Sequence, residues 1–251
     1  IAILSVTVNA AGQVIIAESH SSYISSNGIL HVVGEVNNNL DSTVKNVQIK
    51  ATFFDSTNNI IATVATQSML NIILPGEKSP FEILLSDQST VNKVNSYDLV
   101  VSSYSKPIDI LPQNLRIISN NSYISKSEYY NIHGKILNEG PSRCTYTMIA
   151  ATCYDTNGKV VGTTQGFTDP ATIISGREAQ FNIIIRDSEQ SKKVSSYALQ
   201  VQSNEAVMIP EFPLVVIPLF TAILASITIL QRKTVVIPVM HAIRAVNLTS
   251  T

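Results

Sequence analysis

A long internal repeat constrains this sequence more than any other feature. Residues around Tyr23 return around Tyr123, and the correspondence continues to Tyr97 and Tyr197 at a constant spacing of 100 residues. The clearest matches are Tyr23-Ile24-Ser25 with Tyr123-Ile124-Ser125, Gly34 with Gly134, Ala51-Thr52 with Ala151-Thr152, Phe81-x-Ile83 with Phe181-x-Ile183, and Lys93-Val94-x-Ser96-Tyr97-x-Leu99 with Lys193-Val194-x-Ser196-Tyr197-x-Leu199. Solenoid units are about 20–50 residues long, so this longer period predicts two tandem domains of one fold.

Both copies alternate apolar and polar residues with the period of a β-strand. In the first copy, the alternation predicts one strand with an inward set of Leu30, Val32, Gly34 and Val36 and an outward set of His31, Val33 and Glu35. The matching outward residues of the second copy include His133 and Lys135. The next strand has Val47, Ile49, Ala51 and Phe53 inward, matched by Thr147, Ile149, Ala151 and Cys153. We therefore expect each strand to bury one face and to expose the other.

Turn signals separate these strands. Asn157-Gly158 lies between two strand-like runs and predicts a hairpin, with Asn58-Asn59 at the matching place in the first copy. Asp155 beside it favours a turn stabilised by local hydrogen bonds over the start of a calcium loop, because the later carboxylates of such a loop are missing. Short strands, regular turns and no amphipathic helix pattern predict an all-β chain of two tandem immunoglobulin-like antiparallel β-sandwiches.

The two cysteines, Cys144 and Cys153, fall in one predicted strand of the second copy. Extended chain separates them by roughly 30 Å and their odd spacing places them on opposite faces, so we expect no disulfide between them.

The hairpin residues also resemble a known family. Ala51-Thr52-Phe53-Phe54-Asp55 and the run from Ala151 to Val160 are similar to the aromatic-Asp hairpin of FxLYD domains, and Pro75-Gly76-Glu77 with Phe81-x-Ile83 resembles that family's second feature. Cys153 departs from the large apolar residue that the family prefers. The resemblance implies small extracytoplasmic β-sandwiches of surface proteins and lipoproteins, with no activity attached.

A segment without charged side chains follows the repeats, from Phe212 to Leu230, and is closed by Arg232 and Lys233. About 20 apolar residues suffice for an α-helix to cross a bilayer, so we predict one C-terminal transmembrane helix. No acidic residue follows the span, so the positive-inside rule puts the C-terminus in the cytoplasm and the repeats outside. Pro210-Glu211-Phe212 before the span resembles archaeal sorting tails of the PEF-CTERM type. Because the tail continues to Thr251, we favour an uncleaved anchor over a processed signal.

These features predict a division of the whole chain. Residues 1–10 are either the remnant of a secretory signal peptide, which we favour, or a first strand. Residues 15–104 and 115–203 are the two sandwiches, with a linker at 105–114 that carries Pro107 and Pro112. A juxtamembrane linker covers 204–211, the span 212–230 and a cytoplasmic tail 231–251.

Little in the sequence indicates catalysis or a cofactor. The net charge of −1 argues against a nucleic-acid partner, and we find no nucleophile elbow, zinc-protease motif or phosphate loop. His31 and His133 lie on matching strands and are either a metal or pH-sensing pair or, as we favour, two solvated histidines. Tyr97 and Tyr197 are expected in the cores rather than facing a ligand. Asn120-Asn121-Ser122, ahead of a strand, is a candidate N-glycosylation acceptor at Asn120.

The sequence thus predicts a non-enzymatic, single-pass cell-membrane protein without metal or cofactor, serving binding, adhesion or envelope structure. Its expected partners are the lipid bilayer and other envelope or membrane proteins. One alternative is an accessory subunit of a larger membrane complex, which Ala222, Ala225 and Ser226 would suit by permitting close helix packing. Another is a metal-handling envelope protein that uses His31 or His133.

Overall fold

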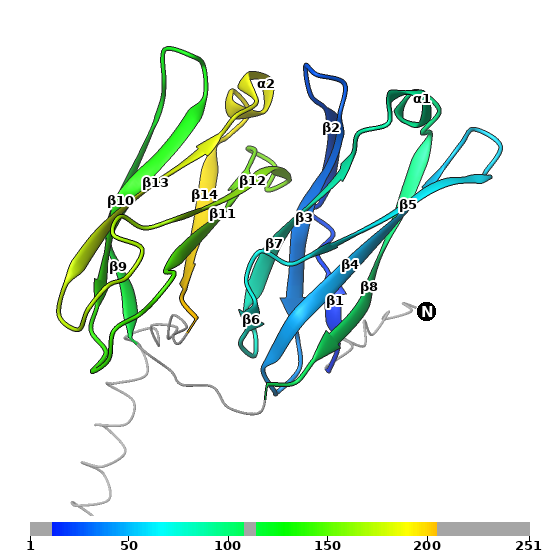
Figure 1. The fold of residues 1–251 in the computed structure, drawn as a ribbon. Helices are drawn as coiled ribbons and strands as arrows, with labels where there is room; N and C mark the ends of the chain where they lie inside the picture. Colours follow the sequence, from blue (N-terminus) through cyan, green and yellow to red (C-terminus); the bar gives the residue numbers. More distant parts are fainter. Residues whose placement is uncertain (1–11, 108–113, 205–251) are drawn as a thin grey trace, which may run out of the picture. The chain divides into compact units, whose positions relative to one another are not determined.

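The computed structural model describes residues 12–107 and 114–204, which form antiparallel β-sheets and two short helices (Figure 1). This confirms the all-β prediction. The first repeat contains β1 (Val14–Ile16), β2 (Ser21–Ile24), β3 (Leu30–Asn38), β4 (Val44–Phe54), β5 (Ile60–Gln67), β6 (Ile72–Ile73), β7 (Lys78–Leu85), α1 (Gln88–Val91) and β8 (Ser96–Ser105). The second contains β9 (Leu115–Ile124), β10 (Tyr130–Asn138), β11 (Met148–Tyr154), β12 (Val160–Phe167), β13 (Glu178–Ile185), α2 (Ser188–Ser191) and β14 (Ser196–Gln202).

Each repeat is β-sandwich-like and consists of two sheets. In the first repeat, β3 pairs with β1, β2 and β7, while β4 pairs with β5, β6 and β8. In the second, β10 lies between β9 and β13, and β11 lies between β12 and β14 (Figure 1). The residue pairs across β3 and β7 recur across β10 and β13 at the 100-residue spacing, as Gly34 opposite Phe81 and Gly134 opposite Phe181 show. The repeated sequence therefore folds into repeated strand pairs.

The inward residues of these strands form one hydrophobic core in each repeat. Val32, Val36, Ile49, Phe53 and Phe81 lie in the first core, and their counterparts Ile132, Ile136, Ile149, Cys153 and Phe181 lie in the second. The expected inward faces of β4 and β11 are thus confirmed, including Cys153 in the place of Phe53. Although the cores are separate, both repeats belong to one compact unit of the chain.

One prediction about the cysteines is wrong. Cys144 and Cys153 remain thiols, as expected, but both are buried in the second core instead of lying on opposite faces. β11 begins only at Met148, and Tyr146 before it has a positive φ of 48°, which interrupts the extended chain. Cys144 instead pairs with Ile173 in an isolated bridge. The alternation of faces therefore does not run from one cysteine to the other.

The predicted hairpin turns are present at matching places. Asp155 Oδ1 accepts hydrogen bonds from the backbone N–H groups of Asn157 (2.8 Å) and Lys159 (2.9 Å), and Gly158 has the positive φ of 76° that the turn needs. Asp55 plays the same role in the first repeat. The backbone N–H of Asn59 and the Thr57 hydroxyl hydrogen-bond to its carboxylate and lower its pKa to about 2. A local hydrogen-bonded turn therefore accounts for the aspartates.

Replacing Asp55 with alanine is expected to destabilise the protein at neutral pH, by an amount that depends on pH. The carboxylate has a lower pKa in the folded state than in the unfolded chain, so its stabilisation is present above about pH 4 and is lost as the pH falls towards about 2. Urea unfolding of parent and variant across this range measures the difference. Asp155→Ala serves as the matched variant in the second repeat. If the difference in unfolding free energy between parent and Asp55→Ala stays constant with pH, the lowered pKa of Asp55 is contradicted.

Several predictions concern residues that the structure does not describe. Among the described residues, no helix has the length and apolar character needed to span a membrane. The predicted span 212–230, the motif Pro210-Glu211-Phe212, the stop residues Arg232 and Lys233, and residues 1–10 all lie outside the described ranges.

Candidate functional site

The outward face of β3 is where the structure departs most from the predicted pattern. Val33 is fully buried and Glu35 is only 2% exposed, although both were expected to face solvent. The reason is that β3 and β7 of the first repeat pack against β11 and β12 of the second. The facing residues Ala150 and Thr152 of β11 are buried as well, at 0% and 1%. In the second repeat, His133 and Lys135 of β10 are exposed, as the pattern predicts.

Glu35 is a buried carboxylate at this contact between the repeats. Its Oε1 accepts hydrogen bonds from the Thr152 hydroxyl (3.0 Å) and from the Tyr154 hydroxyl (2.7 Å). Its Oε2 lies 3.5 Å from the Lys78 ammonium, which is itself half exposed. Burial, followed by the hydrogen bond and the charge of Glu35, raises the pKa of Tyr154. Burying a carboxylate costs free energy unless its oxygens have hydrogen-bond or ion-pair partners. Two of the three partners of Glu35, Thr152 and Tyr154, come from the second repeat.

Backbone groups extend the same contact. The N–H of Val160 donates to the Ser19 carbonyl (2.8 Å), and the Val160 carbonyl accepts from the Ser21 hydroxyl (2.5 Å). At another point, Gln202 Oε1 accepts from the N–H groups of Asn71 and Ile72, at 2.9 and 3.2 Å. These bonds specify one register between the two repeats, since each depends on a particular carbonyl or amide.

A cleft with a volume of about 510 Å³ lies beside this contact. Its first-repeat wall comes from β2, the β2–β3 turn, β3, β7 and Met69. Its second-repeat wall comes from β12, the end of β13 and the two residues that precede α2. Ligand sites are commonly clefts of roughly 300–1,000 Å³ and occur preferentially at domain interfaces. This cleft is therefore the candidate binding site among the described residues.

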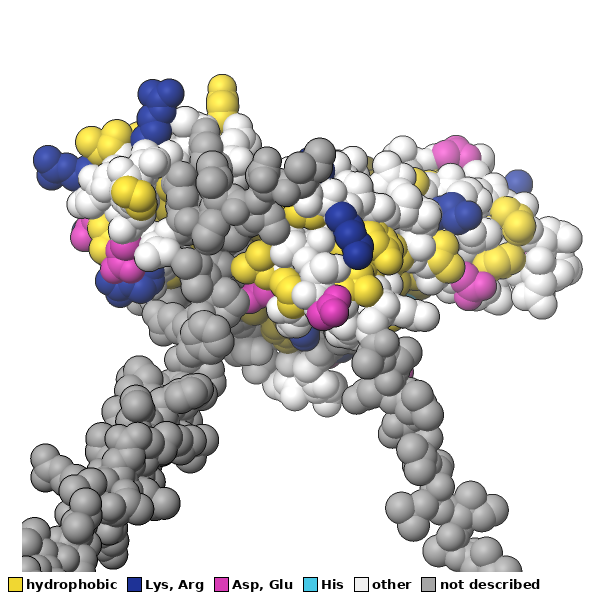
Figure 2. Space-filling view, turned by 90° about the horizontal axis from the view of Figure 1, so that it is seen from below, with side chains coloured by type: hydrophobic (Ala, Val, Ile, Leu, Met, Phe, Trp, Pro, Cys, Tyr) yellow, Lys and Arg dark blue, Asp and Glu magenta, His cyan; other side chains and the backbone are white. Residues whose placement is uncertain are grey.

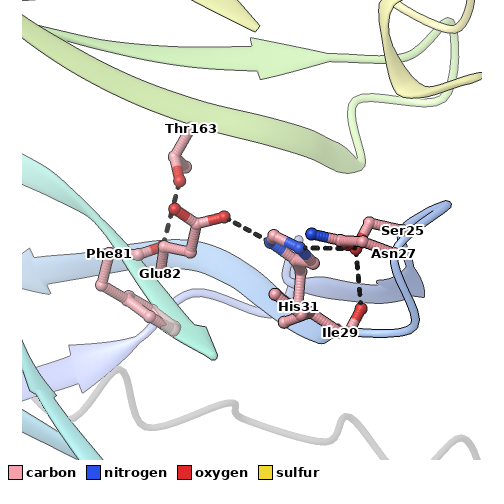
Figure 3. Close-up of polar contacts among 7 residues, drawn as sticks. All are labelled: Ser25, Asn27, Ile29, His31, Phe81, Glu82 and Thr163. Atoms are coloured by element: carbon pink, nitrogen blue, oxygen red, sulfur yellow. Dashed lines mark hydrogen bonds and ion pairs between the residues drawn. The ribbon is translucent and has the colours of Figure 1, made fainter. Parts of the chain in front are cut away.

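A histidine–carboxylate pair is held within the first-repeat wall (Figure 3). His31 Nδ1 lies 2.7 Å from Glu82 Oε1, and His31 Nε2 lies 3.1 Å from the Ser25 hydroxyl. The Thr163 hydroxyl, from the opposite wall, donates to the Phe81 carbonyl at 3.4 Å. The side chains of His31 and Glu82 are 17% and 27% exposed, so both are oriented by their partners yet still reach solvent.

Tyr23 lies beside this pair. Its ring stacks on the His31 imidazole with centroids 4.6 Å apart and planes inclined by 6°. Burial raises the pKa of the Tyr23 hydroxyl, and the carboxylates of Glu82 and Asp187 raise it further. Asp187 belongs to the second repeat, so carboxylates from both walls influence one hydroxyl at the cleft.

The histidines are therefore not equivalent, and the prediction of two solvated side chains is wrong for His31. His133 is exposed and makes an edge contact with Tyr123, with ring centroids 5.6 Å apart. His31 has both ring nitrogens engaged in the cleft. Within residues 12–107 and 114–204, no three His, Cys, Asp or Glu side chains come together as metal ligands.

The other predicted residues lie away from the cleft. Tyr97 and Tyr197 pack against the two cores, which confirms their expected role. Asn120 lies within β9 rather than ahead of a strand. Its side chain is exposed, and its Oδ1 accepts a hydrogen bond from the Tyr197 hydroxyl at 2.8 Å.

The alternation of residues along each strand did not predict the burial of Glu35 or the presence of the cleft. The available signal was divergence between copies at outward positions, where Val33 and Glu35 correspond to His133 and Lys135. Charged and hydrophobic side chains are interspersed over the face seen in Figure 2, so that view offers no single-sign patch as an alternative site.

Comparisons with known proteins leave the family open. No protein-family profile matches the sequence, and no curated protein matches it. Among solved structures, Amycolatopsis orientalis exo-chitosanase CsxA aligns with 76% of this chain and 26% of its own, at 10% identity and a TM-score of 0.29. Red sea bream transglutaminase aligns with 80% and 32%, at 7% identity and a TM-score of 0.25. This chain spans about a quarter to a third of those proteins, and likenesses this weak carry no functional argument.

Proposed function

We propose that this chain is a binding, adhesion or envelope-structural protein of the cell surface, without catalytic activity. In this proposal, two immunoglobulin-like sandwiches stand outside the membrane and one C-terminal helix, residues 212–230, anchors them. The observation that carries the binding role is the polar cleft between the repeats, whose walls are oriented by hydrogen bonds across the contact. The uncharged segment and the basic residues Arg232 and Lys233 support the anchor.

The geometry gives less support to the metal-handling alternative. A metal at His31 would have to displace either Glu82 or Ser25 from the imidazole, because both nitrogens already have partners. No feature of the described residues specifically favours an accessory role in a larger complex over a binding role.

Membrane anchoring is tested on the full chain by alkaline extraction of membranes. We expect the parent to stay in the pellet and Leu224→Arg to shift to the supernatant, because a charge at the centre of a span costs about 3 kcal/mol on insertion. Ser250→Arg, in the predicted tail, is the matched control and should behave as the parent does. Extraction of the parent by alkali would contradict the anchor.

Orientation needs a separate measurement. A cysteine introduced at Lys126, which is exposed in the turn between β9 and β10, should react with an impermeant maleimide on intact cells, whereas one at Ser250 should react only after lysis. The native thiols of Cys144 and Cys153 are buried, so they give little background. Labelling of both introduced cysteines, or of Ser250→Cys alone, on intact cells would contradict the proposed topology.

A further inference from the structure

We propose that the cleft between the repeats binds a neutral, hydroxyl-rich ligand, namely an oligosaccharide. This inference deepens the binding role proposed above and rests on it, but it does not depend on the membrane anchor. It follows from the hydrogen-bonding groups that the cleft presents, from their balance of charge and from the apolar surface among them.

Unused hydrogen-bonding groups face the cleft from both repeats. Glu82 uses Oε1 for His31, and its Oε2 has no partner among the described residues. Asp187 uses Oδ1 for the backbone N–H of Gln190 and likewise keeps Oδ2. The guanidinium of Arg186 and the side-chain amide of Gln165 form no hydrogen bond or ion pair with the described part of the chain.

These groups include both acceptors and donors. The carboxylate oxygens only accept, the guanidinium only donates, and the amide does both. A sugar hydroxyl donates one hydrogen bond and accepts others, so vicinal hydroxyls can satisfy a carboxylate and a neighbouring donor together. A ligand with only donors or only acceptors would leave part of each wall unsatisfied, which costs binding free energy.

The charges lining the cleft favour a neutral ligand. The carboxylates of Glu82 and Asp187 are offset in part by the guanidinium of Arg186, so groups of both signs line the cleft. A strongly anionic ligand would meet the two carboxylates, and a strongly cationic one would meet the guanidinium. Tyr23 and Ile184 add apolar surface of the kind on which the C–H groups of a sugar ring pack. The volume of about 510 Å³ fits a short oligosaccharide better than an extended polymer enclosed along its length.

The test uses the full chain in a detergent without a sugar headgroup, so that the detergent does not compete. Four neutral trisaccharides serve as probes: maltotriose, cellotriose, mannotriose and tri-N-acetylchitotriose, each titrated to about 10 mM by calorimetry. We expect at least one to bind with a dissociation constant of about 1 mM or tighter. Glu82→Gln should weaken that binding about tenfold, because it removes the charged acceptor while keeping the side-chain shape.

Glu178→Gln is the matched control, since Glu178 is also a carboxylate with a side-chain partner but lies outside the cleft, 3.0 Å from Lys135. It should bind the probe as the parent does. If Glu82→Gln fails to fold, Arg186→Ala replaces it, because Arg186 is exposed and makes no hydrogen bond or ion pair with residues 12–107 or 114–204. Absence of binding by all four probes, or equal affinity in the parent and the cleft variant, would overturn the proposal. The result of the alkaline extraction does not depend on whether these sugars bind. The two experiments therefore distinguish a wrong ligand class from a wrong membrane anchor.

Discussion

Glu35→Ala is expected to lower the free energy of unfolding by about 3 kcal/mol. The substitution removes the acceptor of two hydrogen bonds from Thr152 and Tyr154, and hydrogen bonds to a charged group contribute about 1.5–3 kcal/mol each. Thr152 is buried and would keep an unsatisfied hydroxyl, whereas Tyr154 is partly exposed and can bond to water. Lys78 is half exposed, so its ammonium regains hydration and adds little to the cost. Urea unfolding followed by circular dichroism measures the change.

The repeat itself supplies the control for this experiment. Lys135 occupies the position of Glu35 in the second copy, where it is exposed, so Lys135→Ala should change the stability by no more than about 0.5 kcal/mol. Glu35→Gln keeps an acceptor oxygen and should fall between the two. If Glu35→Ala costs no more than Lys135→Ala, the carboxylate does not hold the repeats together.

Gly134→Ala is expected to destabilise the protein by about 3 kcal/mol, the upper end of the usual cost of overpacking. An added Cβ would clash with the Ser119 backbone carbonyl and would lie 2.7 Å from Cζ of the Phe181 ring. Ser119 is paired with Lys135, next to a register shift in the β9–β10 ladder, so displacing its carbonyl would disturb that pairing. The same urea titration measures this change.

Gly34→Ala is the matched variant in the first repeat. Its Cβ would lie 2.8 Å from both His20 Cβ and Phe81 Cζ, without a backbone carbonyl among its nearest neighbours. We expect a smaller loss, about 2 kcal/mol, because side chains adjust more readily than a strand does. A Gly134→Ala variant as stable as the parent would show that the β9–β10 pairing gives way at little cost.

The sequence predicted well what local pattern controls. The inward residues of β4, from Val47 to Phe53, and the turns at Asp55 and Asp155 follow from period-two alternation and Asx chemistry, and the structure confirms them. The outward face of β3 could not be predicted in this way. Its partners Thr152 and Tyr154 are 117 and 119 residues away in the chain, and alternation within one strand contains no information about them.

The candidate site was harder to predict for the same reason. His31 and His133 look alike as strand residues, yet only His31 lines the cleft, whose opposite wall comes from the second repeat. The cleft contains side chains from both copies, including Glu82 and Asp187, that no single motif brings together. Comparing the two copies position by position gives the better signal, because a duplicated surface diverges where only one copy is covered.

The two repeats contact each other through different faces, β3 and β7 of the first and β11 and β12 of the second. This asymmetry affects whether further copies could add to either end. A preceding copy docked in the same manner would lie over β4 and bury Lys50, the counterpart of Ala150, and a following copy would lie over β10 and bury Lys135, the counterpart of Glu35. Burying Lys50, which forms no ion pair among the described residues, or the Lys135–Glu178 pair, whose charged atoms lie 3.0 Å apart, would cost desolvation free energy. Lysines at these two positions therefore disfavour the end-to-end addition of further like units through the same kind of contact.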